Sequence, residues 1–408
     1  MKHIGMKSMI KHIICCMLLL CGVNVMATNW TDVVVEKPDS YIEWNDTIFL
    51  NDSRAVAWVA SVSNGINGAD SSTFLGKTLF LTRDVNMSEH EFSKFISTFD
   101  GVFDGNNHSI TSMVDSSCSF CRVNRGEIKN LKRNGGIVGQ WIERYSYRSC
   151  AMFAVENYGK VRNCSATYTE LSYISSIAIT VGCMVANNYG VVDGCKIAGK
   201  WIVSGNIPEN SCFGGIVARN YGVVKNCVNK AIIDGYCYAT GGIVAENQGE
   251  IFNCSNIGVV RGGATYSGGL VGIMIGEDAE LKNSYSLGKQ DGNGLVGMMK
   301  SGAVYNCYAT TSKSFFGEDS YTDQNSYIYA CIDSVSAIPT GCYGFQGNGR
   351  KCILVDKIYD TFDMPTALNS WVDMQPSEGL AKWKLDTEYE NEGYEDIKSE
   401  ITTIEDTL

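Results

Sequence analysis

The sequence has few prolines, few histidines and little charge. Five prolines and four histidines occur in 408 residues, and 19% of the residues are charged. Only His90 and His108 follow the N-terminal segment, and neither lies in an H-E-x-x-H pattern, which argues against zinc-peptidase chemistry. The net charge of −11 argues against nucleic acid or an anionic membrane surface as a partner, because either requires a basic face.

Long apolar runs are also missing, apart from one at the N-terminus. Three lysines precede an apolar stretch at residues 13–23, and Val25-Met26-Ala27 resembles a cleavage site. This stretch is shorter than the roughly 18 residues of a membrane-spanning helix. We expect residues 1–27 to be a signal peptide and the chain to be exported to the cell surface, the outer membrane or the medium. Cys21 leaves a lipid anchor open as an alternative.

Glycine is abundant, with 43 residues, and much of it belongs to a repeated phrase. The phrase recurs every 23 to 33 residues, and a second phrase of the type GGIVA precedes most copies. The copies are NRGEIKNL from Asn124, NYGKVRNC from Asn157, NYGVVDGC from Asn188, NYGVVKNC from Asn220, NQGEIFNC from Asn247, and more loosely EDAELKNS from Glu277 and MKSGAVYNC from Met299.

Each unit contains short β-branched runs bounded by glycine and asparagine, which favours strands joined by tight turns. The same residue type at the same place in successive units indicates parallel coils stacked about 4.8 Å apart. We predict an all-β fold, a right-handed parallel β-helix (solenoid) with an N-terminal capping helix and a small C-terminal capping region. The expected parts are an N-terminal cap at 28–77, repeats at 78–316, a C-terminal cap at 317–394 and an acidic tail at 395–408.

The caps are expected to contain the few helices. Asp52 and its neighbours precede an apolar stripe that predicts a helix at about Arg54–Ser63, with strands following at Thr78–Leu81 and within 101–113. Met364–Val372 is expected to form a short helix near the far end.

One position of the phrase is expected to form a column inside the coils. An asparagine repeated once per coil can bond its counterpart in the next coil. Cysteines in one column lie about one coil spacing apart, whereas a disulfide needs Cβ atoms about 3.8 Å apart, so we expect buried thiols. The column comprises Cys164, Cys195, Cys227, Cys254 and Cys307 with the preceding Asn163, Asn226, Asn253 and Asn306. Three further cysteines lie outside the column and allow one disulfide of unknown pairing: Cys331, Cys342 and Cys352.

The phrases resemble those of GLUG-motif proteins, which are exported β-helical surface proteins of Bacteroidetes. The openings AVAWVASVSNG, GKTLFLTRDVNMS and FDGVFDGNNHSITSM and the ending TALNSWV also resemble that family, from about Ala55 to Tyr394. The resemblance implies a β-helix and an adhesin-like role; the motif also occurs as a module in some secreted peptidases. Cys183 and Ala279 stand where glycine is expected.

No catalytic constellation, cofactor site or metal site is evident. The outward position of the phrase carries Lys129, Arg162, Asp193, Lys225, Phe252, Lys282 and Tyr305, with only one acid. Aromatic residues between the phrases are candidates for contacting sugar rings: Tyr168, Tyr173, Trp201, Tyr236, Tyr238 and Tyr266.

Two functions therefore stay open. The first is a non-catalytic surface structural and adhesion protein, whose partners are host or bacterial glycans or proteins. The second is a carbohydrate-active β-helix enzyme, a polysaccharide lyase or glycoside hydrolase, with its carboxylates in the longer inserts. A carboxylate cluster in a groove would favour the second function.

Overall fold

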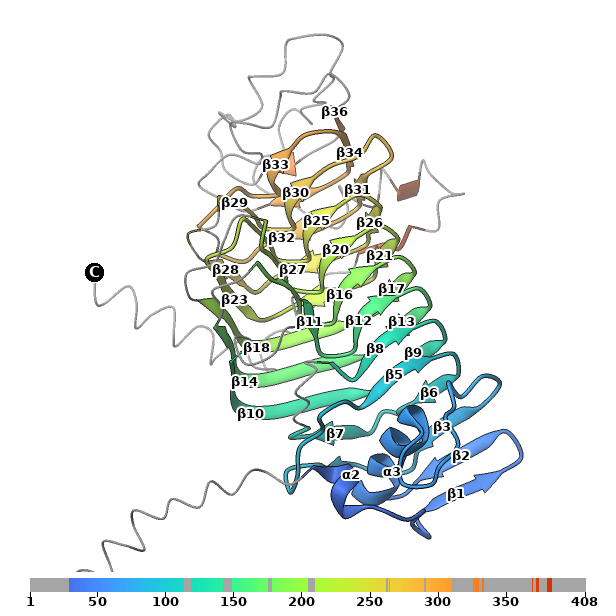
Figure 1. Cartoon of the computed structure of the whole chain (residues 1–408). Coiled ribbons are helices and arrows are strands. Elements are labelled where there is room, and N and C mark those ends of the chain that lie inside the picture. The colour runs from blue at the N-terminus through green and yellow to red at the C-terminus, as the bar shows by residue number, and fades with distance from the viewer. Residues whose placement is uncertain are drawn as a thin grey trace, which may run out of the picture.

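The repeats form a stack of coils in which each coil adds one strand to each of several parallel sheets. A computed structural model describes residues 29–113, 119–141, 149–174, 178–204, 210–261, 263, 265–289, 291–309, 326–329, 332–333, 369, 372–373 and 380–383. Figure 1 shows the coils following one another along one axis. The solenoid makes about seven turns. The predicted parallel β-helix is confirmed.

The two recurring phrases build two of the sheets. The apolar end of GGIVA continues into a strand of sheet I, and the residues after N-x-G form a strand of sheet II. Sheet I consists of β5 (Ile96–Phe99), β8 (Cys121–Asn124), β12 (Ala154–Asn157), β16 (Val185–Asn188), β20 (Val217–Asn220), β25 (Val244–Asn247), β30 (Val271–Met274) and β33 (Val296–Met299). Sheet II consists of β1 (Tyr41–Trp44), β2 (Thr47–Leu50), β3 (Thr78–Leu81), β6 (Val102–Asp104), β9 (Glu127–Lys129), β13 (Lys160–Arg162), β17 (Val191–Asp193), β21 (Val223–Lys225), β26 (Glu250–Phe252), β31 (Glu280–Lys282), β34 (Gly302–Tyr305) and β36 (Ser326–Tyr329).

The segments between the phrases build the other two sheets. Sheet III consists of β4 (Val85–Asn86), β7 (Ser109–Thr111), β10 (Lys132–Trp141), β14 (Ser165–Ile174), β18 (Lys196–Ser204), β22 (Val228–Asn229), β23 (Ile232–Gly235), β27 (Ser255–Asn256), β28 (Val259–Arg261), β32 (Tyr285–Ser286), β35 (Tyr308–Ala309) and β37 (Ile332–Asp333). Sheet IV consists of β11 (Ser149–Ala151), β15 (Thr180–Gly182), β19 (Cys212–Gly214), β24 (Ala239–Gly241) and β29 (Tyr266–Gly268).

Neighbouring coils are in register, so equivalent residues lie one above another. Val161 pairs with Val192 and Val192 with Val224, and all three side chains are buried. Among the described strands, only β1 and β2 pair antiparallel. The apolar column inside sheet II is continuous because seven successive coils supply a branched apolar residue at this position: Ile128, Val161, Val192, Val224, Ile251, Leu281 and Val304.

Two helices lie at the N-terminal end of the stack, α2 (Trp30–Val33) and α3 (Ser53–Asn64) (Figure 1). The helix predicted at Arg54–Ser63 is α3, which begins where the Asp52 side chain accepts a hydrogen bond from the backbone N–H of Ala55. It ends at Gly65, which has a left-handed backbone with φ of 63°. The strand predicted at Thr78–Leu81 is β3, and the segment 101–113 contains β6 and β7.

Most of the predicted C-terminal cap lies outside the described residues, including the greater part of the helix expected at Met364–Val372 and Cys331, Cys342 and Cys352. Its described part contacts the side of the stack. The indole N–H of Trp383 donates to Oδ1 of Asn283, and its ring lies edge-on to Tyr285 with centroids 4.7 Å apart. No helix in the described ranges is both long and apolar enough to cross a membrane.

Candidate functional site

The turn from sheet I to sheet II is built from the N-x-G part of the phrase. The asparagine side chain is buried, and its Nδ2 donates to Oδ1 of the asparagine in the next coil, at 2.7 Å from Asn157 to Asn188 and 2.8 Å from Asn188 to Asn220. A Cβ atom on Gly190 would lie 2.1 Å from the carbonyl oxygen of Gly159. Because the first and third residues are fixed in this way, the middle residue of each turn faces solvent. The whole asparagine ladder consists of Asn124, Asn157, Asn188, Asn220 and Asn247.

Three of these middle residues are tyrosines that stack on one another. The ring centroids of Tyr158 and Tyr189 are 4.8 Å apart, those of Tyr189 and Tyr221 are 4.9 Å apart, and the planes differ by 8° and 6°. The three residues are 51%, 45% and 37% exposed. Arg125 and Gln248 hold the same position in the flanking coils. The molecule therefore carries an exposed tyrosine column, Tyr158–Tyr189–Tyr221, on a buried hydrogen-bonded ladder.

The stacking decides which atoms of the tyrosine column can meet a ligand. Both faces of the Tyr189 ring are covered by its neighbours, so only its edge and hydroxyl group remain open. An aromatic edge carries the positive part of the ring quadrupole and attracts oxygen atoms, whereas a face attracts cations. The column therefore suits hydroxyl, carboxylate or amide oxygens along its length and flat apolar groups only at its two ends.

A row of polar side chains on sheet I lies beside the tyrosine column. The Tyr158 hydroxyl donates to Oε2 of Glu156 at 3.4 Å, and Nε2 of Gln248 donates to Oε1 of Glu246 at 2.9 Å. Nε of Arg219 lies 3.7 Å from Oε2 of Glu246. Desolvation, followed by the charge of Glu156, raises the pKa of Tyr158, so this phenol stays protonated at neutral pH.

The aromatic residues proposed from sequence as glycan contacts do not lie together. Tyr168 and Trp201 are buried and pack edge-on at 5.4 Å, so neither ring faces a ligand at the surface. Their segments are strands β14 and β18, in which alternate side chains point into the coil. This part of the expectation is wrong for that reason.

Three of the remaining glycan candidates lie in two neighbouring coils. Tyr236 is 60% exposed. Tyr238 and Tyr266 are partly buried, with rings edge-on at 5.2 Å, and they pack on a small cluster that includes Ala218 and Ala245. The side chain of Tyr173 lies outside the described residues.

The cysteine column lies inside the turn from sheet II to sheet III. Cys164, Cys195, Cys227, Cys254 and Cys307 are buried free thiols. Each sulfur contacts the carbonyl oxygen of an inward-facing residue in the preceding coil, as Cys164 does with Ile128 at 3.7 Å. In the coil with Ser284, the hydroxyl donates to the carbonyl oxygen of Lys282 instead. Before this position stand asparagines with left-handed backbones, with φ from 42° to 55°: Asn130, Asn163, Asn226, Asn253, Asn283 and Asn306.

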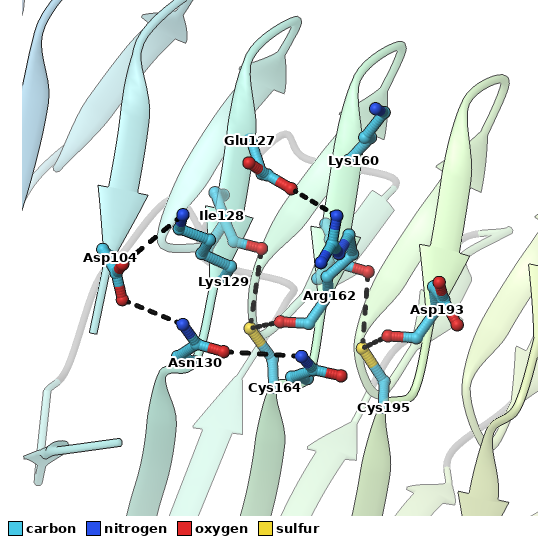
Figure 2. A network of polar contacts seen from close by, with 12 residues as sticks. Asp104, Glu127, Ile128, Lys129, Asn130, Lys160, Arg162, Cys164, Asp193 and Cys195 are labelled. Atoms are coloured by element: carbon cyan, nitrogen blue, oxygen red, sulfur yellow. Dashed lines mark hydrogen bonds and ion pairs between the residues drawn. The ribbon is translucent and has the colours of Figure 1, made fainter. Parts of the chain in front are cut away.

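Most described outward carboxylates of sheet II are neutralised by neighbouring cations, as Figure 2 shows for the first coils. Glu250 on β26 is exposed without a described ion pair, and its register partner Glu280 is paired with Lys282. Paired carboxylates differ from two free carboxylates flanking a bond to be cleaved. Within the described ranges, no three His, Cys, Asp or Glu side chains converge to hold a metal. The ion pairs join Asp104 to Lys129 at 3.5 Å, Glu127 to Arg162 at 3.2 Å and Asp193 to Lys225 at 3.8 Å.

The tyrosine column was missed as a site by the sequence reasoning, although a signal was present. Tyrosine follows the ladder asparagine in three successive phrases, beginning at Asn157, Asn188 and Asn220. A residue repeated at one place in stacked coils must lie above its counterpart, so the stack was foreseeable.

Comparisons with known proteins add little about function. No family model matches the chain, and no curated protein matches it. Among solved structures, the chain is similar to a candidate immunoglobulin A1 protease from Bacteroides ovatus, with 16% identity and a TM-score of 0.43, over 70% of this chain and 84% of that one.

Proposed function

We propose that this protein is a non-catalytic surface structural and adhesion protein, whose stacked coils present the tyrosine column to a partner. The observation that carries the proposal is the exposure of three aligned phenol rings on a ladder of buried amides. Each tyrosine is at least 37% exposed, so the column contributes much less to the core than buried residues do. Rigid, exposed aromatic and polar groups are typical of recognition surfaces.

The chemistry of the column supports a hydroxyl-rich or amide-rich partner. Ring edges and phenol hydroxyls offer weak and strong donors to oxygen atoms, and Glu156 and Arg219 extend the polar surface beside them. Surface glycans fit this pattern, and so do protein surfaces rich in main-chain oxygens. Export belongs to the same proposal; it rests on the leader-like sequence of residues 1–27 and on the resemblance to GLUG-motif proteins.

A carbohydrate-active enzyme is the alternative. Such an enzyme needs one carboxyl group that is protonated and another that is ionised and free. Asp104, Glu127, Asp193 and Glu280 on sheet II instead pair with cations, which leaves Glu250 without a second free carboxylate beside it on this sheet and favours a binding role over hydrolysis or elimination.

The decisive experiment combines a glycan array with a turnover assay on acidic and neutral polysaccharides. The full mature chain is expected to bind a defined group of glycans and to leave all polysaccharides intact. The variant with Tyr158→Gln, Tyr189→Gln and Tyr221→Gln uses the residue that Gln248 already supplies at this position, and it is expected to lose that binding.

The matched control is Trp44→Gln, which removes an exposed aromatic ring outside the column and outside the glycan candidates. It should bind as the unchanged protein does, and circular dichroism should show that both variants keep their strands. Depolymerisation of any polysaccharide, or full binding by the triple variant, would contradict the proposal.

A further inference from the structure

The corner between sheets II and III carries a second column of amides, part of which faces solvent. Asn163 and Asn226 are exposed at this corner, whereas Asn253, Asn283 and Asn306 are buried. Where the column is continuous, each Nδ2 donates to Oδ1 of the preceding asparagine, at 2.8 Å from Asn283 to Asn253 and 2.9 Å from Asn306 to Asn283. This pattern uses one N–H and one lone pair of each amide and leaves the others available.

The buried part of the column shows what the spare groups accept. Nδ2 of Asn283 donates to the carbonyl oxygen of Ala381, and Oδ1 of Asn283 accepts from the indole of Trp383. Residues far along the chain thus bind this corner from outside by one donor and one acceptor. The same pair of groups is presented to solvent where the column is uncovered.

A break in the column lies above Asn163. Gly194 occupies the asparagine position of the next coil with φ of 66°, so no amide there continues the ladder. A Cβ atom on Gly194 would lie 2.6 Å from Oδ1 of Asn163, which places that oxygen at the break. Nδ2 of Asn163 lies 3.5 Å from Oδ1 of Asn130, a long contact. Asn163 therefore offers a nearly complete amide at the surface.

Cations flank this amide. Arg162 precedes it, and Lys132 and Lys196 begin the sheet III strands of the coils on either side. Lys132 and Lys196 are exposed and form no ion pair with a described carboxylate. Asp104, Glu127 and Asp193, the acids of the neighbouring sheet II strands, are paired with Lys129, Arg162 and Lys225, and Figure 2 shows the first two of these pairs.

We propose that this basic corner, made of Asn163, Lys132, Arg162 and Lys196, binds an acidic polysaccharide. The amide matches sugar hydroxyls with one donor and one acceptor, and the cations match carboxylate or sulfate groups. The excess of positive charge lies on a chain whose net charge is −11, so the corner attracts anions that the rest of the molecule repels. This surface is separate from the tyrosine column, so either proposal can fail without the other.

The test measures binding of the full mature chain to polygalacturonate, with dextran as the neutral polymer and polyglutamate as the polyanion without sugars. Polygalacturonate should bind more tightly than polyglutamate, dextran should not bind, and affinity should fall as salt rises. Lys132→Gln with Lys196→Gln should weaken polygalacturonate binding by about fivefold or more. The control variant, Lys94→Gln with Lys289→Gln, has the same charge change elsewhere and should bind within about twofold of the unchanged protein.

A second variant isolates the amide. Asn163→Gly keeps the left-handed backbone, as Gly194 does in the next coil, and should weaken polygalacturonate binding while leaving polyglutamate binding unchanged. Equal binding of polygalacturonate and polyglutamate would overturn sugar recognition. Equal weakening by the two lysine variants, or no weakening by either, would overturn the location.

Discussion

Nδ2 of Asn188 donates to Oδ1 of Asn220 at 2.8 Å, in the interior of a stack where neither side chain is exposed. Asn157 donates to Asn188 in the same way, so each amide both gives and accepts one bond along the axis. This relationship fixes the height of the turns between sheets I and II from Asn124 to Asn247. The tyrosine column stands on these turns, so the ladder determines the spacing of the exposed rings.

Asn188→Ala is expected to lower the free energy of unfolding by about 2–4 kcal/mol, because Asn157 loses its ladder acceptor and the buried Oδ1 of Asn220 loses its donor. Urea denaturation followed by circular dichroism measures this loss. Asn163→Gly, at the exposed column, is the control and should cost about 1 kcal/mol or less. Equal losses would show that the buried ladder has no special role.

Gly190→Ala should be among the most damaging single changes. The added methyl group would lie 2.1 Å from the carbonyl oxygen of Gly159, and backbone atoms cannot move aside without separating the coils. Gly194→Asn is the contrasting variant, because asparagine holds this left-handed position in other coils and the nearest obstacle is the movable Asn163 side chain. Thermal unfolding should show a large loss for the first and little change for the second; the reverse order would contradict the assigned turns.

Tyr189→Phe should leave stability unchanged, since stacking needs only the ring. Tyr189→Gln should cost about 1 kcal/mol, because two half-exposed aromatic contacts are lost. Both values come from denaturation curves of the purified chain. A stabilising effect of Tyr189→Gln would indicate that the rings repel one another and that the column is maintained for binding alone.

Stability should fall as the solution becomes alkaline. Burial raises the pKa of Cys307 to about 12 and also raises the pKa of Cys121 and Cys183. These thiols stay neutral in the folded chain but ionise in the unfolded chain near pH 8.5, so the stabilisation is complete below that pH and is lost above it. Urea midpoints at pH 7.5 and 10 measure the slope, which Cys307→Ser should reduce; a midpoint independent of pH would contradict the burial of these thiols.

The fold was predictable because the repeat of 23 to 33 residues is longer than any single helix or strand of the structure. Most copies of the phrase also carry the same turn residues. The prediction that asparagines bond from coil to coil needed only the rule that equivalent residues stack. Both follow from local spacing, as the bond between Asn157 and Asn188 illustrates.

The surfaces were less predictable, for two physical reasons. Trp201 lies in a long strand and turns inward, and its direction depends on where β18 begins, which the sequence does not define. The basic corner could not be inferred from the net charge, because Lys132 and Lys196 belong to different coils and come together only when the coils stack. The docking of Trp383 on Asn283 joins residues 100 positions apart and has no local signal.

Both proposed surfaces depend on neighbouring coils being in register, and cross-linking of paired cysteines tests this most directly. Glu156 and Asn187 are register partners on β12 and β16, and Arg219 lies one coil further on. With Glu156→Cys and Asn187→Cys, a short thiol-bridging reagent should link the two positions almost completely, while Glu156→Cys with Arg219→Cys should link poorly. Equal linking of both pairs, or none of either, would contradict the stacked coils and the columns built on them.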